Sequence, residues 1–230
     1  VGCETIASNR TDLNGGGVSI GGIGVVSNSA GFTVYGNRAA LVGGGIYLGG
    51  MGSVVHGCTV VSTNTAGGGG GGGIYLVDGG TVHGLSAVVA SNTANGPGGG
   101  IYIGGFTGNV LDCETISGNR AVNGHGGGIY INGLADIRNS SGNGAIVDNV
   151  ATSGSFHGGG VYMGSGRILG YAEISRNRAG VAGGGVAAMS GPGLASNTTM
   201  SIVDNMAQFV GGIAFPNSGT VFNCSNVERN

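Results

Sequence analysis

Short apolar runs rich in Val and Ile alternate along the chain with breaks rich in Gly, Asn and Ser, and the alternation is periodic. One landmark is Ile or Val, followed by two residues and then Asn. Successive landmark asparagines are 28, 27, 28, 27, 30, 28, 28 and 25 residues apart. A nearly constant period of this length indicates a repeat architecture. The landmark asparagines are Asn9, Asn37, Asn64, Asn92, Asn119, Asn149, Asn177, Asn205 and Asn230.

A second landmark is a glycine run followed by Ile or Val and usually Tyr. Complete copies are Gly43–Tyr47, Gly71–Tyr75, Gly98–Tyr102, Gly126–Tyr130 and Gly158–Tyr162, and degenerate copies are Gly15–Val18, Gly183–Val186 and Gly211–Ile213. Each period also holds three short β-prone runs split by turn residues. In one period these runs are Thr81–His83, Ser86–Val89 and Ile101–Ile103.

Three such runs close into a three-sided rung, and rungs stack through parallel hydrogen bonds. Crossover handedness favours a right-handed coil. We therefore predict an all-β protein: a right-handed parallel β-helix (β-solenoid) of about eight 27–28-residue coils, forming a single domain over residues 1–230.

Two other folds are compatible with part of the pattern. Leucine-rich repeats share the period, but they need a Leu-rich motif and usually a helical segment in each repeat. Bundles of polyproline II helices need glycine at every third residue. The chain shows neither pattern, and no window has an apolar stripe at helical spacing.

Equivalent residues of a β-helix stack into columns. We expect the landmark asparagines from Asn9 to Asn205 to form an internal ladder of stacked amides at a corner. Strand alternation places one tyrosine of each complete glycine motif on the outside. These tyrosines stiffen the sheet or offer an interaction face for a neighbouring rod or a sugar. They are Tyr47, Tyr75, Tyr102, Tyr130 and Tyr162.

Glycine supplies 57 of the 230 residues, whereas charged residues make up only 8%, with a net charge of −2. All the basic residues are arginines. This balance argues against nucleic acid as a partner, which needs a basic face. No apolar run approaches 18 residues, so we expect no membrane span in this segment. The start, Val1–Glu4, has no features of a signal peptide, and we expect a mature or truncated piece of a longer protein.

The residue before the ladder asparagine is charged in the last four coils, as Asp148, Arg176, Asp204 and Arg229. Alternating signs in one column predict a salt ladder, because opposite charges on neighbouring strands attract. We find no other cluster of acids with arginine. The sequence therefore predicts no catalytic residue, no cofactor and no metal site.

Four cysteines, Cys3, Cys58, Cys113 and Cys224, each lie six residues before a landmark asparagine and share a column. The first three are two coils apart, or about 9–10 Å, which is beyond the reach of a disulfide. We therefore predict free thiols.

Four histidines fall in two places. His56 and His83 lie near one column, but without a carboxylate or thiolate partner they form only a weak metal site. His125 and His157 precede glycine runs, and we expect them to be solvated.

Glycosylation sequons occur at Asn9, Asn139, Asn197 and Asn223. Asn9 belongs to the ladder and should be inaccessible, so Asn139, Asn197 and Asn223 are the candidate glycosylation sites. The coil at residues 137–167 is irregular, with a long interval between asparagines and a long loop at Ala151–His157. Insertions in solenoids form loops, often on a binding face, and we expect a local protrusion here.

The two landmarks, Gly-Gly-Gly-Ile-Tyr and Ile/Val-x-x-Asn-x-Ala, resemble the polymorphic outer-membrane-protein repeat. That repeat carries a GGA-Ile/Leu/Val motif and an FxxN motif. It occurs in chlamydial surface adhesins and other large surface proteins with pectin-lyase-like β-helices. The resemblance covers essentially the whole chain and implies a right-handed β-helix at a cell surface. The chain departs from the repeat in having Gly for the Ala, Ile or Val for the Phe, and no autotransporter barrel.

These observations lead us to expect an extracellular or cell-surface structural protein, a building block of a fibre, filament or surface appendage that self-associates end to end or laterally. A cell-surface adhesin that binds a receptor or glycan through the tyrosine face is the alternative. A polysaccharide lyase or hydrolase is a remote alternative, because such sites need clustered acids with Arg or Lys, often with calcium.

Overall fold

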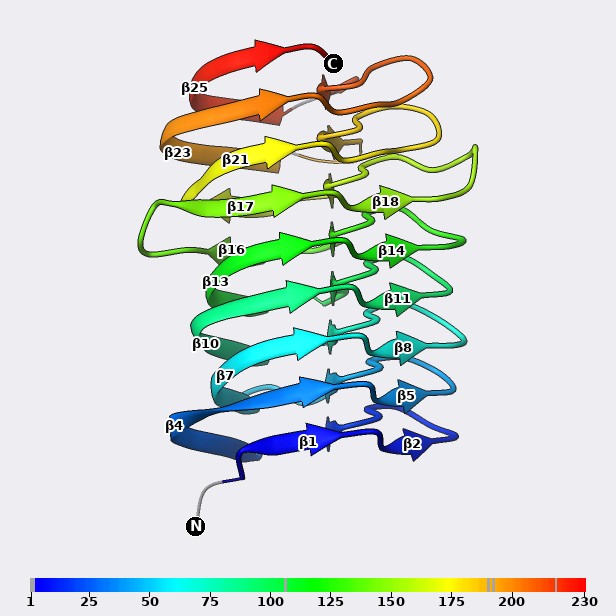
Figure 1. Cartoon of the computed structure of the whole chain (residues 1–230), viewed down its shortest axis with the longest axis vertical. Coiled ribbons are helices and arrows are strands. Elements are labelled where there is room, and N and C mark those ends of the chain that lie inside the picture. The colour runs from blue at the N-terminus through cyan, green and yellow to red at the C-terminus, as the bar shows by residue number, and fades with distance from the viewer. Residues whose placement is uncertain (1–2, 106, 190, 192, 218) are drawn as a thin grey trace.

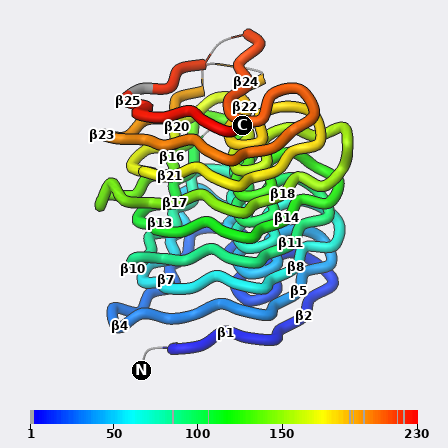
Figure 2. Tube along the Cα trace, turned by 45° about the horizontal axis from the view of Figure 1, so that its top comes forward, coloured from blue at the N-terminus to red at the C-terminus, as the bar shows by residue number. Residues whose placement is uncertain are grey.

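The computed structural model describes residues 3–105, 107–189, 191, 193–217 and 219–230, so six positions of the predicted 1–230 domain lie outside the described residues. The chain forms a stack of coils from the N-terminal to the C-terminal end. The front strands run across the stack, and all of them point in the same direction (Figure 1). The tilted view in Figure 2 shows successive coils superposed in register. The prediction of a right-handed parallel β-helix of about eight coils is confirmed. No helix in the described part of the chain is long and apolar enough to cross a membrane.

The described residues form three parallel sheets, of 11, 6 and 8 strands. The long sheet contains β1 (Thr5–Ala7), β4 (Val25–Tyr35), β7 (Val54–Ser62), β10 (Thr81–Ala90), β13 (Asn109–Ser117), β16 (Asp136–Arg138), β17 (Gly144–Val147), β20 (Gly166–Leu169), β21 (Tyr171–Ser175), β23 (Gly193–Val203) and β25 (Gly219–Glu228). The bridge sheet contains β2 (Arg10–Thr11), β5 (Arg38–Ala39), β8 (Thr65–Ala66), β11 (Thr93–Ala94), β14 (Arg120–Ala121) and β18 (Val150–Ala151). The tyrosine sheet contains β3 (Val18–Ile20), β6 (Ile46–Leu48), β9 (Ile74–Leu76), β12 (Ile101–Ile103), β15 (Ile129–Ile131), β19 (Val161–Met163), β22 (Val186–Ala188) and β24 (Ile213–Ala214).

Two of the three predicted runs are halves of one bent strand. In β10 the runs Thr81–His83 and Ser86–Val89 belong to the same strand, and the register against β7 and β13 shifts between them. The bend contains a residue with positive φ, Ser86 at 52° in β10 and Asp112 at 56° in β13. Residues with a Cβ atom adopt this conformation at a cost of about 1 kcal/mol, so we infer that the surrounding rungs impose the bend.

The bridge sheet is a feature that the sequence pattern did not predict. Its strands are two residues long and directly follow the ladder asparagines, so that Arg120 pairs with Thr93 below it and with Val150 above it. The second residue of these strands points inward, and Ala121 is fully buried. The alanine two residues after the landmark asparagine is therefore a core residue.

The core is a set of aliphatic columns that run along the axis. Inward residues of the tyrosine sheet, such as Ile101 and Ile103, face inward residues of the long sheet, such as Val89 and Val110, and all are at most 2% exposed. Because each coil repeats the same inward positions, no coil has a core of its own, and stability comes from the stacking of neighbours.

The irregular coil carries two insertions. Asn109 pairs with Asp136, an offset of 27, whereas Thr115 pairs with Ala145, an offset of 30, so three extra residues lie between β16 and β17. A further two lie after β18, since Ile129 pairs with Val161. Both loops stand out from the stack in Figure 1, beside β17 and beyond β18. The expected protrusion at Ala151–His157 is thus accompanied by a second one at residues 139–143.

Candidate functional site

The ladder asparagines form one continuous chain of hydrogen bonds along a corner of the β-helix. The Oδ1 atom of each accepts from both the backbone N–H and the Nδ2 atom of the asparagine one coil earlier. These bonds measure 2.9–3.1 Å in all eight links from Asn9 to Asn230. The ladder therefore crosses every described coil.

Each interior amide uses its full hydrogen-bonding capacity. The Nδ2 atom of Asn119 donates to Asn149 Oδ1 in the next coil and, at 2.9 Å, to the carbonyl of Val89 in the preceding coil. Its Oδ1 accepts the two bonds from Asn92. The side chain is fully buried. A carboxylate would lack the donors and a hydroxyl would lack the reach, so only an amide satisfies all four contacts.

The two sequence landmarks meet in space. The last glycine of each complete run packs on the ladder asparagine of the next coil, and a Cβ atom on Gly100 would lie 2.9 Å from Asn119 Cγ and 2.8 Å from the carbonyl oxygen of Gly128. Contacts this short are not tolerated by real Cβ atoms. Close packing on the asparagine and on the neighbouring carbonyl therefore accounts for the Gly at this position.

The residue before each ladder asparagine has a left-handed backbone conformation, with φ between 49° and 63°. It is Gly36 or Gly118 in two coils and a residue with a side chain in the others. The ladder holds the strained residues from Ser8 to Asp204 in place, because the asparagine that follows each of them donates its backbone N–H to the next coil.

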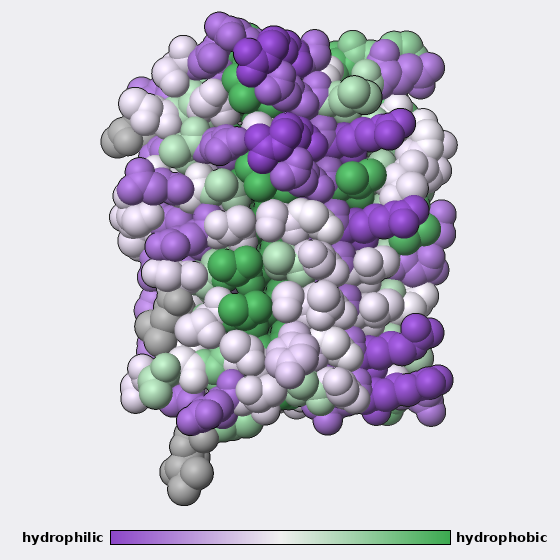
Figure 3. Space-filling view, in the orientation of Figure 1, coloured by the Kyte–Doolittle hydropathy of each residue, from purple (hydrophilic) through white to green (hydrophobic). Residues whose placement is uncertain are grey.

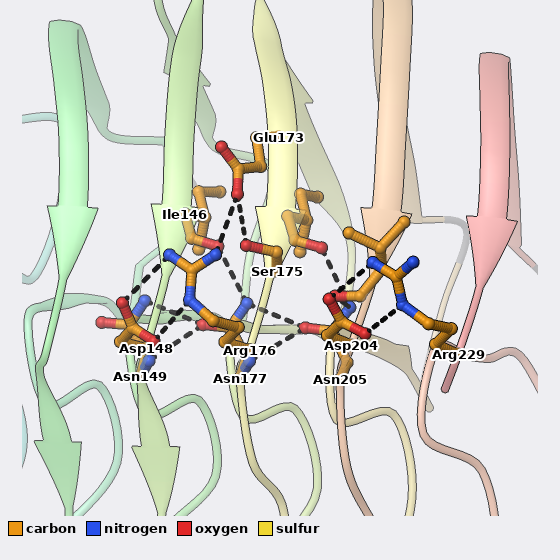
Figure 4. A network of polar contacts seen from close by, with 12 residues as sticks. Ile146, Asp148, Asn149, Glu173, Ser175, Arg176, Asn177, Asp204, Asn205 and Arg229 are labelled. Carbon is orange, nitrogen blue, oxygen red and sulfur yellow. Dashed lines mark hydrogen bonds and ion pairs between the residues drawn. The ribbon is translucent and has the colours of Figure 1, made fainter.

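Charged residues at this position form two separate ion pairs (Figure 4). Arg176 contacts Asp148 at 2.9 Å and also contacts Glu173 at 3.3 Å, and Arg229 contacts Asp204 at 2.6 Å. The guanidinium of Arg229 lowers the pKa of Asp204 by donating hydrogen bonds to it. The described residues thus show discrete pairs in place of an unbroken salt ladder.

The five tyrosines of the tyrosine sheet form a continuous stack. Successive ring centroids are 5.9, 4.4, 5.0 and 5.1 Å apart from Tyr47 to Tyr162, and the last three pairs are within 8° of parallel. Burial, followed by the neighbouring phenol of Tyr102, raises the pKa of Tyr130 to about 12. The interior rings have both faces covered by their neighbours, so they present edges to solvent. A sugar stacks on a ring face, and the interior of this column does not offer one.

His125 and His157 continue the aromatic column, and the expectation that they are solvated is wrong. The His125 ring lies 4.5 Å from the Tyr162 ring and 5.4 Å from the His157 ring. His125 Nδ1 accepts the backbone N–H of His157 at 3.0 Å. Burial, together with the neighbouring His157, lowers the pKa of His125 to about 4. Burial also lowers the pKa of His157, so the neutral form of both rings is favoured.

The cysteines are free thiols, as predicted. Each Sγ atom donates to the carbonyl oxygen two residues later, for example Cys58 to Val60 at 3.6 Å and Cys113 to Thr115 at 3.7 Å. Burial raises the pKa of both of these thiols to about 12. Cys58 and Cys113 therefore act as small buried apolar groups.

A hollow of about 350 Å³ opens over the bend between β10 and β13. His83 Nε2 lies 2.7 Å from Asp112 Oδ2, so this histidine has the carboxylate partner that its column position did not reveal. Burial opposes ionisation of Asp112, but hydrogen bonds from Ser140 and His83 outweigh it and lower the pKa of Asp112. Among the described residues no group of three or more His, Cys, Asp or Glu is arranged to hold a metal ion.

Two of the sequon asparagines are structural. Asn139 is 3% exposed, and its Nδ2 atom donates to the carbonyl of Cys113. Asn197 is 9% exposed and donates to the carbonyl of Gly142. Both pin the inserted loop at residues 139–143, so neither side chain is available for a glycan in the folded protein. Asn223 is exposed and stays a candidate glycosylation site.

Comparison of the chain with protein-family models, curated proteins and solved structures finds no match. The motif resemblance therefore supports the β-helix without assigning a family.

Sequence reasoning missed one surface feature whose signal was present. An Asn-Arg dipeptide occurs at the ladder position in four coils, with arginines Arg10, Arg38, Arg120 and Arg178. The structure places these arginines in one exposed column on the bridge-sheet side.

Proposed function

We propose that this chain is a structural element, a rigid β-helical building block of an extracellular filament or surface appendage. The observation that carries the proposal is the unbroken asparagine ladder, which joins every described coil to the next by the same pair of hydrogen bonds. A ladder of this kind makes each coil a template for another, because every rung offers the acceptors and donors that the next rung needs.

The aliphatic column supports the same proposal. Its member Val227 is 51% exposed. Val227 belongs to the inward aliphatic column and pairs with the buried Ile202. A further rung stacked on β25 would bury it and continue the parallel hydrogen bonding. The motif resemblance to large surface proteins favours a location outside the cell.

An adhesive role is the second candidate, favoured by the protruding loops and by the arginine column. The tyrosine stack contributes less to it, because its interior ring faces are covered. A lyase or hydrolase role would have to use the His83–Asp112 hollow. Turnover of an acidic polysaccharide, lost on substitution of His83 by Gln, would overturn the proposal.

Self-association tests the structural role. Light scattering and negative-stain microscopy over a range of protein concentrations should show rods whose mass and length increase with concentration. Val227→Asp places a charge on the open end of the core and should keep the protein monomeric. Leu134→Asp is the matched control, because Leu134 is 67% exposed on a lateral loop, and it should associate as the wild type does. A wild-type protein that stays monomeric at every concentration would contradict the proposal.

A further inference from the structure

The first residue of each bridge-sheet strand points outward, and together these residues form a column that we call the arginine stripe. Strand register and isolated bridges place the residue after each ladder asparagine directly above its equivalent in the coil before. In chain order the column reads Arg10, Arg38, Thr65, Thr93, Arg120, Val150, Arg178 and Met206.

All four arginines of the stripe are exposed. Within the described chain none of them makes an ion pair, whereas Arg167, Arg176 and Arg229 all do. Figure 3 shows long hydrophilic side chains projecting along the right-hand edge of the molecule, which is the bridge-sheet side in Figure 1. A protein with a net charge of −2 thus presents a one-sided line of positive charge.

The spacing of the stripe follows from the rungs. Neighbouring rungs are about 4.8 Å apart, so Arg10 and Arg38 are adjacent, Arg120 follows three rungs later, and Arg178 lies about 29 Å from Arg10. The strands that carry the stripe are only two residues wide. The positive charge is therefore long and narrow.

Polar groups that suit sugar hydroxyls fill the longer gap between the arginines, and Val150 occupies the shorter one. Thr65 and Thr93 occupy the two rungs between Arg38 and Arg120, and Asn123 donates to Asn95 Oδ1 at 2.9 Å beside them. At the far end Arg178 lines a groove of about 490 Å³ together with Thr152 and Gln208. The Nε atom of Arg120 donates to Thr152 Oγ1 at 2.9 Å, which connects the stripe to the inserted loop after β18.

We propose that the arginine stripe binds an acidic polysaccharide, with sulfate or carboxylate groups on the arginines and the sugar chain extended along the axis. Arginine pairs sulfate and carboxylate oxygens in a fork geometry. A single polysaccharide strand matches a surface two residues wide, whereas a nucleic-acid duplex needs a broader basic face. Single-stranded nucleic acid needs aromatic stacking platforms, and the column contains no aromatic residue. The site does not depend on the proposed structural role.

Binding to dextran sulfate, with neutral dextran as the uncharged control, tests this proposal. The wild-type protein should bind dextran sulfate and should release it as salt is added, because binding displaces counterions. Substitution of all four stripe arginines by Gln should abolish binding, and Arg178→Gln alone should weaken it roughly tenfold through the lost charge-assisted contact.

Arg138→Gln is the matched control, since Arg138 is also exposed but lies on the long sheet. It removes the same charge and should leave affinity within about twofold, because it lies off the stripe. Circular dichroism of each variant checks that the β-helix is intact. Three results would overturn the proposal. They are an equal loss of affinity for dextran sulfate in Arg138→Gln and Arg178→Gln, unchanged binding by the fourfold variant, and tighter binding of oligothymidylate than of dextran sulfate.

Discussion

The coils up to Tyr130 and the coils after Asn149 share one backbone plan but stabilise their surfaces differently. In the earlier coils the residue before the ladder asparagine is uncharged, as in Thr63 and Ser91, and the tyrosine sheet carries stacked rings. In the later coils that residue is Asp or Arg, and after Tyr162 the tyrosine column is replaced by Ala187 and Ala214. The interior ladder of asparagines is the same in both regions.

This contrast separates what the fold requires from what it permits. The amide ladder and the glycine packed against it persist through both regions, because no other residue fits either position. The two outer columns vary independently: the tyrosine column changes to alanine after Tyr162, and the column before the ladder asparagine is charged from Asp148 onward. Both columns lie on a backbone that is already hydrogen-bonded. The irregular coil marks the change: Asn139 of its inserted loop donates to the carbonyl of Cys113 in the coil before, and the buried Tyr171 of the following coil donates to the same carbonyl.

The largest effect is expected from removing a ladder amide. Asn119→Ala in the earlier region and Asn177→Ala in the later region should each lower the free energy of unfolding by roughly 3 kcal/mol or more, since each leaves several buried groups unpaired. Chemical denaturation measures the loss. Asn123→Ala is the control, because Asn123 is exposed and makes a single side-chain bond. A loss in one region only would break the claim that both share the ladder.

A methyl group against the ladder should have the next largest effect. Gly100→Ala forces Asn119 and the carbonyl of Gly128 to move and should cost about 1–3 kcal/mol. Gly154→Ala is the matched control, because nothing lies within 4 Å of a Cβ at that position. If both variants unfold at the same denaturant concentration, the glycine runs do not serve the ladder.

The tyrosine stack should contribute less per residue. Tyr102→Leu keeps much of the buried area but removes two stacking contacts, each about 0.5–1.5 kcal/mol beyond area burial. The loss should be insensitive to salt. If the free energy of unfolding lost in Tyr102→Leu depended on salt, the same kind of force would stabilise both regions.

The histidines at the junction predict a pH effect. The folded pKa of His125, about 4, lies below its unfolded value of 6.5. The unfolded chain therefore binds the proton first as pH falls, so stability is full above about pH 6.5 and is lost progressively toward pH 4. Thermal unfolding between these values should show the decline, and His125→Gln should flatten it. An identical pH profile for the variant would contradict the assignment.

The smallest effect belongs to the ion pairs. Arg176→Gln should cost less than about 1 kcal/mol at low ionic strength, because both partners are exposed. The difference from the wild type should vanish in high salt. Unfolding curves at low and high salt measure it, and a loss that persists in high salt would point to packing of the arginine stem instead.

The period and the inward and outward positions could be read from the sequence because a β-helix repeats them at fixed spacing. The asparagine ladder was predictable for the same reason, since its residues occupy equivalent places in every coil. The His83–Asp112 pair was not, because the bend in β10 shifts the register and brings together residues that are not equivalent. The burial of Asn139 depends on an insertion, and a periodic pattern contains no information about where an insertion folds.

Hydrogen exchange of the ladder asparagines tests the account most directly. Their backbone N–H groups donate to side-chain oxygens at a corner, where an ordinary turn would leave them open to water. We expect the backbone and Nδ2 protons of Asn64, Asn92, Asn119, Asn149 and Asn177 to exchange as slowly as the amides in the centre of the long sheet. Exchange at the rate of exposed loops, with the sheet amides still protected, would show that the amide ladder does not hold the coils together.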